Sequence, residues 1–178
     1  MRSLTPKQHY EQLLLEKHKD KYPITSSTTP NKYWPNAHQK PKISKATHLE
    51  RCIKEFVEML GHQCSKITTS GTYIAGKKTV GITTSLGTTK GGDGGCYIPG
   101  GSTKGFADLI LTVYGLKLDC EVKYSKGDKQ RDSQVKYQAA VESAGGFYMV
   151  VRNFDDFYRQ FMDFLELPQV ILMKQFNT

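Results

Sequence analysis

The chain of 178 residues is 38% hydrophobic with a mean hydropathy of −0.51, which fits one globular domain plus an arm and excludes two full domains. No apolar run is long enough to span a bilayer and no secretory signal opens the sequence, so we expect a cytoplasmic protein without a membrane partner. The formal net charge of +8 suits a polyanionic partner such as nucleic acid.

Most of the positive charge lies in an N-terminal arm. Residues 1–45 carry nine Lys and Arg against three Asp and Glu, a balance of +6, whereas residues 46–178 carry sixteen against fourteen, a balance of +2. Thr5 and Pro6 are typical of a helix start. The four prolines of residues 22–45 predict a linker or extended arm after that helix. We therefore divide the chain into a basic arm, residues 1–45, and a globular domain, residues 46–178.

The globular domain is expected to open with an amphipathic helix. Thr47 is a candidate N-cap for this helix, and Gly61 a candidate terminator. The predicted buried stripe consists of Leu49, Cys52, Ile53, Phe56 and Leu60. Residues 64–104 are rich in Thr, Gly, Lys and β-branched residues, which predicts short strands and hairpins that end in a mobile glycine-rich loop.

Two strands and a helix are predicted next. Residues 106–124 have the pattern of two strands joined by a tight turn at Tyr114 and Gly115. The helix that follows is expected to be capped by Asp132 or Ser133 and to run to about residue 144, where two glycines end it.

The C-terminal part predicts a strand, a helix and a last strand. Residues 147–151 form a continuous apolar run, typical of a strand buried on both faces. Asn153 is expected to cap an amphipathic helix that ends near Glu166, and residues 169–173 form the last predicted strand. This order of elements predicts an α/β fold. The apolar face of the helix has two open uses, which are to cover the sheet or to form the interface of a homodimer.

The cysteines point to neither a zinc site nor a disulfide scaffold. They are Cys52, Cys64, Cys96 and Cys120. Their spacings of 12, 32 and 24 residues match no zinc-ligand pattern, so we expect reduced, partly buried thiols.

The residues with the strongest chemical signal lie on the strand after the tight turn. With period two, its charged residues share one face, and these are Lys117, Asp119, Glu121 and Lys123. With a two-residue turn at Tyr114 and Gly115, the residue numbers of two cross-strand partners add up to 229. Asp108 is therefore expected to face Glu121. Like charges opposed on a sheet destabilise it by roughly 0.2 to 1 kcal/mol, which a divalent cation would offset.

The two carboxylates and a backbone carbonyl, for which Val122 is the candidate, are hard oxygen ligands suited to Mg²⁺ or Mn²⁺. Lys123 would place a positive charge beside that metal, where it could orient a water or stabilise charge at phosphorus. From the charge alternation alone, an ordinary solvent-facing strand stays an open alternative.

A resemblance to a known family adds to this interpretation. The spacing of the charged residues resembles the PD-(D/E)XK nuclease signature. It consists of Asp108, a gap of twelve residues and then Glu121-Val122-Lys123, with Ala107 in place of the proline. The stretches GSTKGFADLI, EVKYSKGDKQRDSQVKYQ and AGGFYMVV resemble the VRR-NUC nucleases, which are similar in core to Holliday-junction resolvases. The resemblance covers about residues 47–157.

The resemblance implies a restriction-endonuclease-like αβββαβ core, with a mixed central sheet flanked by helices. It implies Asp108 and Glu121 as metal ligands, Lys123 as the catalytic lysine, and Gln134 as the glutamine of the following helix. An acidic residue on the first helix of the core also commonly approaches the metal, and Glu50 is our candidate.

The sequence therefore predicts a Mg²⁺- or Mn²⁺-dependent DNA endonuclease, and the resemblance favours branched or flapped DNA. Candidate nucleic-acid contacts are Lys77, Lys78, Lys104, Lys126, Lys129, Arg131 and Tyr137. Two alternatives stay open. One is a nuclease that cuts ordinary duplex DNA, and the other is a non-catalytic nucleic-acid-binding module on a nuclease-like scaffold.

Overall fold

The fold is α/β, with a four-stranded mixed sheet between helices. A computed structural model describes residues 4–23, 43–67 and 105–176, together with the backbone of four short strands between the last two ranges. The core strands are β1 (Gln63–Lys66), β6 (Leu109–Val113), β7 (Leu116–Val122) and β8 (Phe147–Val151). The helices are α1 (Pro6–Lys21), α3 (Ala46–Met59), α4 (Asp132–Ser143), α5 (Phe154–Leu165) and α6 (Pro168–Phe176).

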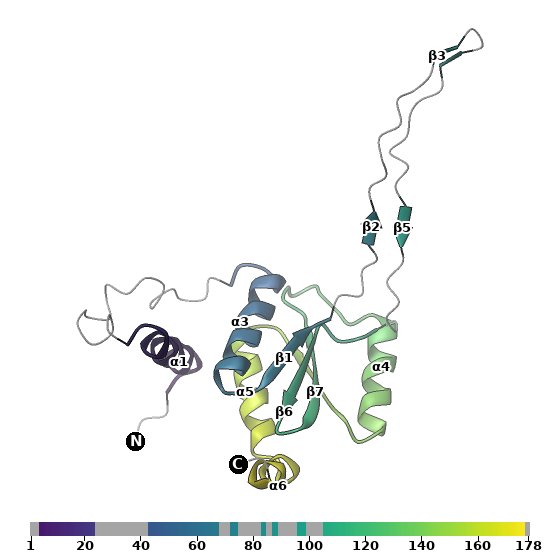
Figure 1. Cartoon of the computed structure of the whole chain (residues 1–178). Helices are drawn as coiled ribbons and strands as arrows, with labels where there is room; N and C mark the ends of the chain where they lie inside the picture. The colour runs from purple at the N-terminus through teal and green to yellow at the C-terminus, as the bar shows by residue number, and fades with distance from the viewer. Residues whose placement is uncertain are drawn as a thin grey trace.

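The sheet has the spatial order β1-β6-β7-β8. β1 pairs antiparallel with β6 and β6 antiparallel with β7, whereas β7 and β8 are parallel. Helix α4 makes the crossover between the two parallel strands, as such a connection requires. Figure 1 shows α4 on one side of the sheet and α3 with α5 on the other.

The main hydrophobic core lies between the sheet and α3 with α5. Both helices have strongly segregated apolar faces, and that of α5 is a row of buried phenylalanines. These are Phe154, Phe157, Phe161 and Phe164. Because this face lies in the core of the monomer, the hypothesis that it forms a dimer interface is wrong, and its use as a cover for the sheet is confirmed.

Helix α1 packs against the same core. Its N-cap Thr5 accepts from the backbone N–H of Gln8, and Pro6 occupies the first turn, which confirms the predicted helix start. Tyr10 is 2% exposed, and its hydroxyl donates to Oε2 of Glu55 at 2.6 Å. The first helix of the basic arm thus contributes a buried ring to the globular domain.

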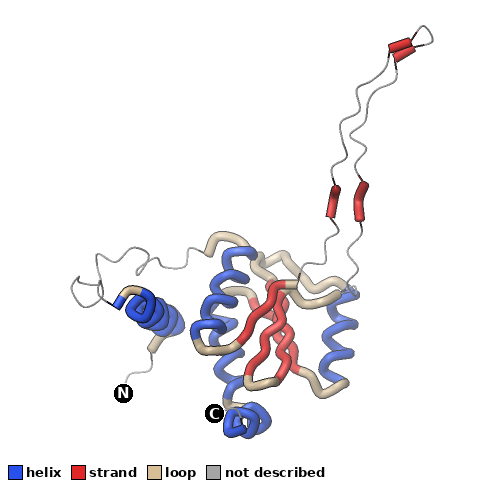
Figure 2. The backbone as a smooth tube through the Cα atoms, viewed as in Figure 1, coloured by secondary structure: helices blue, strands red, loops and turns tan. Residues whose placement is uncertain are grey.

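Four short strands lie between β1 and β6. β2 (Thr72–Ile74) pairs antiparallel with β5 (Cys96–Ile98), and β3 (Thr83–Thr84) pairs antiparallel with β4 (Gly87–Thr88). In sequence the β3–β4 pair lies within the β2–β5 pair, and both pairs lie away from the four-stranded sheet in Figures 1 and 2. These two strand pairs are together called the ribbon. The prediction of short strands in this region is confirmed, whereas the predicted glycine-rich loop lies outside the described residues.

Two predicted helix caps are wrong by one or two residues. Helix α3 begins at Ala46 with Lys45 as N-cap, so Thr47 lies inside its first turn. Helix α4 begins at Asp132, with Arg131 as N-cap. In α4 the side-chain Oε1 of Gln134 accepts the N–H of Arg131, which moves the start of the helix one residue upstream. The cap at Asn153 is confirmed, because its Oδ1 accepts the N–H of Asp156.

Two strand predictions also need correction. Residues 169–173 belong to helix α6, not to a last strand, because Pro168 starts a helix there and Val170 packs into the core. β8 is a strand but is not buried on both faces, since it lies at the edge of the sheet and Tyr148 and Val150 stay partly exposed. None of the helices described is long and apolar enough to cross a membrane.

Candidate active site

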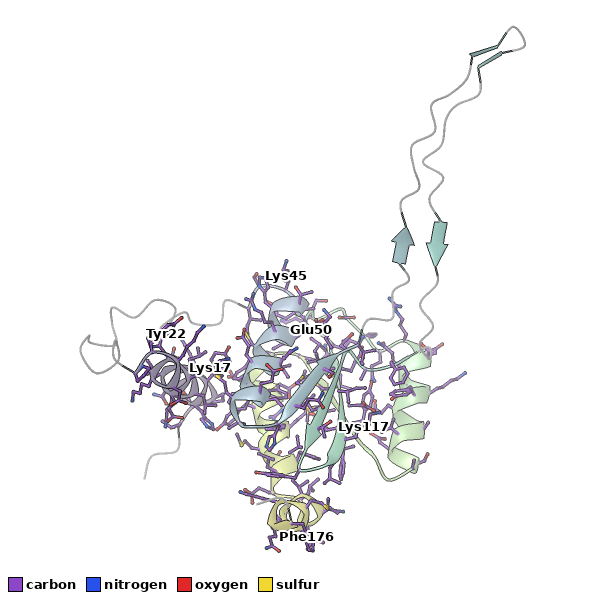
Figure 3. The ribbon with its side chains drawn as sticks, in the orientation of Figure 1. Lys17, Tyr22, Lys45, Glu50, Lys117 and Phe176 are labelled. Atoms are coloured by element: carbon purple, nitrogen blue, oxygen red, sulfur yellow. The ribbon has the colours of Figure 1, made fainter. Side chains whose placement is uncertain are left out.

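A polar cavity of about 370 Å³ opens where α3, β6, β7 and α4 meet. Its charged and amide side chains include Glu50, Asp108, Glu121, Lys123 and Gln134. Figure 3 shows Glu50 at the end of α3 nearest this region. The fold therefore brings together the five side chains that the sequence and its resemblance singled out for catalysis or metal binding, although they come from four different elements.

The hairpin register explains how the two central carboxylates meet. In every β6–β7 pair the two residue numbers add up to 229, from Leu109 with Cys120 to Val113 with Leu116. This is the register that a two-residue turn at Tyr114 and Gly115 predicts. Asp108 directly precedes β6, and its Oδ2 accepts the backbone N–H of Val122 at 2.9 Å. The continuation of the register places Asp108 beside Glu121, and both line the cavity.

Glu121 is fully buried, and one of its carboxylate oxygens is held by two contacts. Its Oε1 lies 2.6 Å from Nζ of Lys123 and accepts from Nε2 of Gln134 at 2.5 Å. The side-chain oxygen of Gln134, Oε1, accepts from Nζ of Lys123 at 3.1 Å and from the backbone N–H of Arg131. Gln134 is thus fixed by the start of its own helix, and it orients both members of the Glu121–Lys123 ion pair. The second carboxylate oxygen of Glu121, Oε2, is buried and has no hydrogen-bond partner.

The strand that carries these residues is buried on both faces. Asp119 and Glu121 are 0% exposed and Lys123 is 7% exposed, because α4 covers the charged face. The alternative of an ordinary solvent-facing strand is therefore wrong. Charged side chains are kept in such a place only when they are paired or hydrogen-bonded.

Burial dominates the electrostatics of the two central carboxyl groups. It raises the pKa of Asp108 above its usual range, with the Val122 N–H opposing this and the Glu50 charge adding to it. Burial likewise raises the pKa of Glu121, where the Lys123 hydrogen bond opposes and the Asp108 charge adds. The Glu50 charge thus disfavours ionisation of Asp108, and the Asp108 charge disfavours ionisation of Glu121, so a positive charge among these carboxylates would lower the pKa values of Asp108 and Glu121.

Glu50 has a cationic partner that sequence reasoning did not assign to the site. Nζ of Lys66, at the end of β1, donates to Oε2 of Glu50. In the sequence, Lys66 is one of several lysines in the lysine-rich region of residues 64–104. No spacing links it to Glu50, because the contact joins β1 to α3. Asp128 was also missed, and its Oδ1 lies 3.9 Å from Nζ of Lys123 at the cavity.

The carboxylate oxygens of the cavity are of the type that binds a hard divalent cation, but the side chains are not arranged as a metal site. Among the residues that the structure describes, no group of three or more His, Cys, Asp or Glu side chains could hold a metal ion. The carboxylates instead take protein partners, which are Lys66 for Glu50, Lys123 and Gln134 for Glu121, and the Val122 N–H for Asp108. Among the described carboxylates that line the cavity, Glu121 is the one with a buried oxygen, Oε2, that has no hydrogen-bond partner.

Tyr137 belongs to a separate polar cluster under α4. Its hydroxyl donates to Oδ2 of Asp119 at 3.1 Å, and Nζ of Lys117 lies 3.0 Å from the same oxygen. The Phe106 ring packs against the Tyr137 ring with centroids 4.8 Å apart. Figure 3 shows Lys117 on the side of the sheet that faces α4. Tyr137 is therefore engaged by Asp119 and is not among the residues that line the cavity.

The candidate nucleic-acid contacts divide into two sets. Lys126, Lys129 and Arg131 are exposed in the loop between β7 and α4, and Arg131 lines the cavity. Lys77, Lys78 and Lys104 lie outside the described residues. Comparison with known proteins adds no family to this description, because no family model, no curated protein and no solved structure matches the chain.

Proposed function

We propose that the protein is a metal-dependent DNA endonuclease that hydrolyses phosphodiester bonds. The observation that supports this most is the convergence of Glu50, Asp108 and Glu121 with Lys123 in one polar cavity. A structural ion-pair network needs no cavity and gains little from two carboxylates with raised pKa values. Perturbed acidic groups that line a cavity beside a buried lysine fit catalysis better.

The proposed cofactor is Mg²⁺ or Mn²⁺. A cation of this kind polarises a phosphodiester and lowers the pKa of the attacking water. Asp108 and Glu121 would hold it, with Glu50 as the third carboxylate and the carbonyl of Val122 as a further oxygen donor. Oε2 of Glu121 is available for this role without loss of the bonds to Oε1.

Lys123 would act on the attacking water and on the phosphate. Its ammonium is almost buried and is fixed by Glu121 and Gln134, so its charge is already oriented before substrate binds. A preorganised charge in a water-poor site stabilises negative charge at phosphorus more strongly than a solvated one. Gln134 is a positioning residue in this proposal, because it orients Glu121 and Lys123 through its amide.

The substrate is proposed to be branched or flapped DNA. Three basic parts of the sequence are candidates for contact with DNA. They are the exposed loop with Lys126, Lys129 and Arg131, the N-terminal arm, and the lysine-containing region between β1 and β6. In sequence the ribbon lies between Ile67 and Gly105, and both of these residues line the cavity. A two-stranded ribbon fits the major groove of duplex DNA, so we assign it a contact with the duplex beside the cut. A homodimer for paired cuts is part of the proposal, and light scattering tests it.

The test is cleavage of labelled four-way-junction, flap and linear duplex DNA with Mg²⁺, Mn²⁺ or EDTA. Wild type should cut branched DNA only with metal, and Lys123→Ala should lose at least about a hundredfold in rate, as expected for loss of a charge that acts in the transition state. The matched control is Lys54→Ala, since Lys54 forms an exposed pair with Glu58 on the outer face of α3. Binding without cutting in every metal would refute the nuclease and favour the binding module. Equal cutting of linear duplex would refute structure selectivity alone.

A further inference from the structure

Two lysines pair with carboxylates that line the cavity, and their surroundings differ. The side chain of Lys123 is 9% exposed and is held by Glu121 and Gln134. The side chain of Lys66 is 48% exposed, although it is paired with Glu50, whose side chain is only 11% exposed. Lys123 is therefore fixed, whereas Lys66 reaches in from solvent to neutralise one buried carboxylate.

Lys66 acts on the metal-ligand candidates from the side of α3. In the sheet register it lies opposite Leu109, next to Asp108 along the chain, and its charge helps to lower the pKa of Asp108 while Glu50 raises it. The ammonium thus offsets negative charge on Glu50 and Asp108 together. This is the electrostatic task that a bound divalent cation would perform at the same carboxylates.

We propose that Lys66 is an internal counter-ion that occupies the cation-binding carboxylate Glu50 until a divalent metal displaces it, and that it then contacts the DNA phosphate. This rests on the proposed function. The geometry favours such an exchange, because a lysine has a flexible four-carbon stem and half of this side chain is already in solvent. Because Lys66 directly precedes Ile67, which lines the cavity, its ammonium would remain within reach of a phosphate bound there after it leaves Glu50.

The exchange also accounts for the absence of a ready metal site among the described residues. Glu50 is bound to Lys66, so the third carboxylate is not free to join Asp108 and Glu121. A cation must compete with the ammonium for Glu50. Removal of that competitor should strengthen metal binding, whereas a lysine that only supports the fold would leave metal binding unchanged.

The experiment measures Mn²⁺ binding to metal-free protein by isothermal titration calorimetry and by electron paramagnetic resonance, without DNA. Lys66→Met should bind Mn²⁺ more tightly, on the order of tenfold, because one positive charge beside the ligands is gone. Lys54→Met is the matched control, since it removes the same charge from an exposed pair on the same helix that carries Glu50, and should change the affinity less than about twofold. Thermal unfolding of each variant verifies that it is folded.

A second variant separates local competition from general charge. In a Glu50→Gln background, Lys66→Met should no longer raise Mn²⁺ affinity, because the carboxylate for which lysine and metal compete is absent. With Ca²⁺ in place of Mg²⁺, Lys66→Met should bind branched DNA several-fold more weakly than wild type, and Lys66→Arg should restore most of that affinity. Wild-type Mn²⁺ binding with no gain in Lys66→Met would overturn the counter-ion role alone. Absence of Mn²⁺ binding in wild type and Lys66→Met alike would overturn the metal-dependent function itself.

Discussion

Gly105 links the base of the ribbon to the helix that carries Gln134, and its substitution tests that link. Gly105 has φ +92°, and a Cβ added there would lie 2.2 Å from the backbone oxygen of Ser133 and 2.5 Å from its carbonyl carbon. The neighbouring atoms are backbone in the first turn of α4, so no side chain can rotate away. An ordinary contact begins at 3.4 Å, and 3.4 − 2.2 leaves a shift of about 1.2 Å to be absorbed.

Gly145, at the other end of α4, provides the matched control. It has φ +78°, but a Cβ there would meet nothing within 4 Å. Gly145→Ala should therefore cost only the positive-φ penalty, about 1–2 kcal/mol. Gly105→Ala adds an overpacking cost of about 1–3 kcal/mol, for a total of roughly 2–5 kcal/mol.

The assay is urea and thermal unfolding of both variants, followed by circular dichroism. At about 2–4 °C per kcal/mol for a chain of this size, Gly105→Ala should lower the Tm two to three times as far as Gly145→Ala. It should also reduce cleavage, because a shift of the first turn of α4 moves Gln134 away from Glu121 and Lys123. Equal losses of stability in the two variants would refute the argument from close backbone contact.

Three further predictions concern the electrostatics, the N-terminal helix and the thiols. The pKa values of Asp108 and Glu121 are raised in the folded protein, so protonation of these groups stabilises the fold. In EDTA this stabilisation should be complete below about pH 4, where the same groups are protonated in the unfolded chain. It should be lost as the pH rises through their pKa values in the folded protein. Asp108→Asn should flatten this dependence in urea unfolding from pH 4 to 7, and an unchanged slope would contradict the assigned shift. Tyr10→Phe keeps the buried ring but removes the hydrogen bond to Glu55, and it should lower the free energy of unfolding by about 1.5 kcal/mol. No change in the urea midpoint would mean that this hydrogen bond does not stabilise the fold. Burial raises the pKa of Cys52 to about 11 and that of Cys64 to about 12, and it also raises the pKa of the Cys120 thiol. These three free thiols should therefore react with a disulfide reagent at pH 8 only after unfolding. Rapid labelling of the folded protein at any of the three, located by mass spectrometry, would contradict that burial.

Local patterns in the sequence were sufficient to identify most of the elements and the central pair of carboxylates. A two-residue turn at Tyr114 and Gly115 determines the β6–β7 register, and that register alone predicts that Asp108 meets Glu121. Both turn residues adopt positive φ, as a tight hairpin of this type requires. The helix at residues 168–176 was missed because a short apolar run has no period that separates a strand from a buried helix.

Long-range packing determines the environment of the candidate site, and no local sequence pattern predicts that packing. The alternation of charge on β7 is the same for a solvated strand and for a buried one, and only the placement of α4 over the strand makes Glu121 fully buried. The pairing of Lys66 with Glu50 likewise depends on how α3 lies against the end of β1. The sequence by itself therefore determined which ionisable groups share a strand face and register, because those follow from backbone geometry over a few residues. The tertiary structure alone decided their burial, their pKa shifts and their cationic partners, because these depend on groups that are distant in the chain.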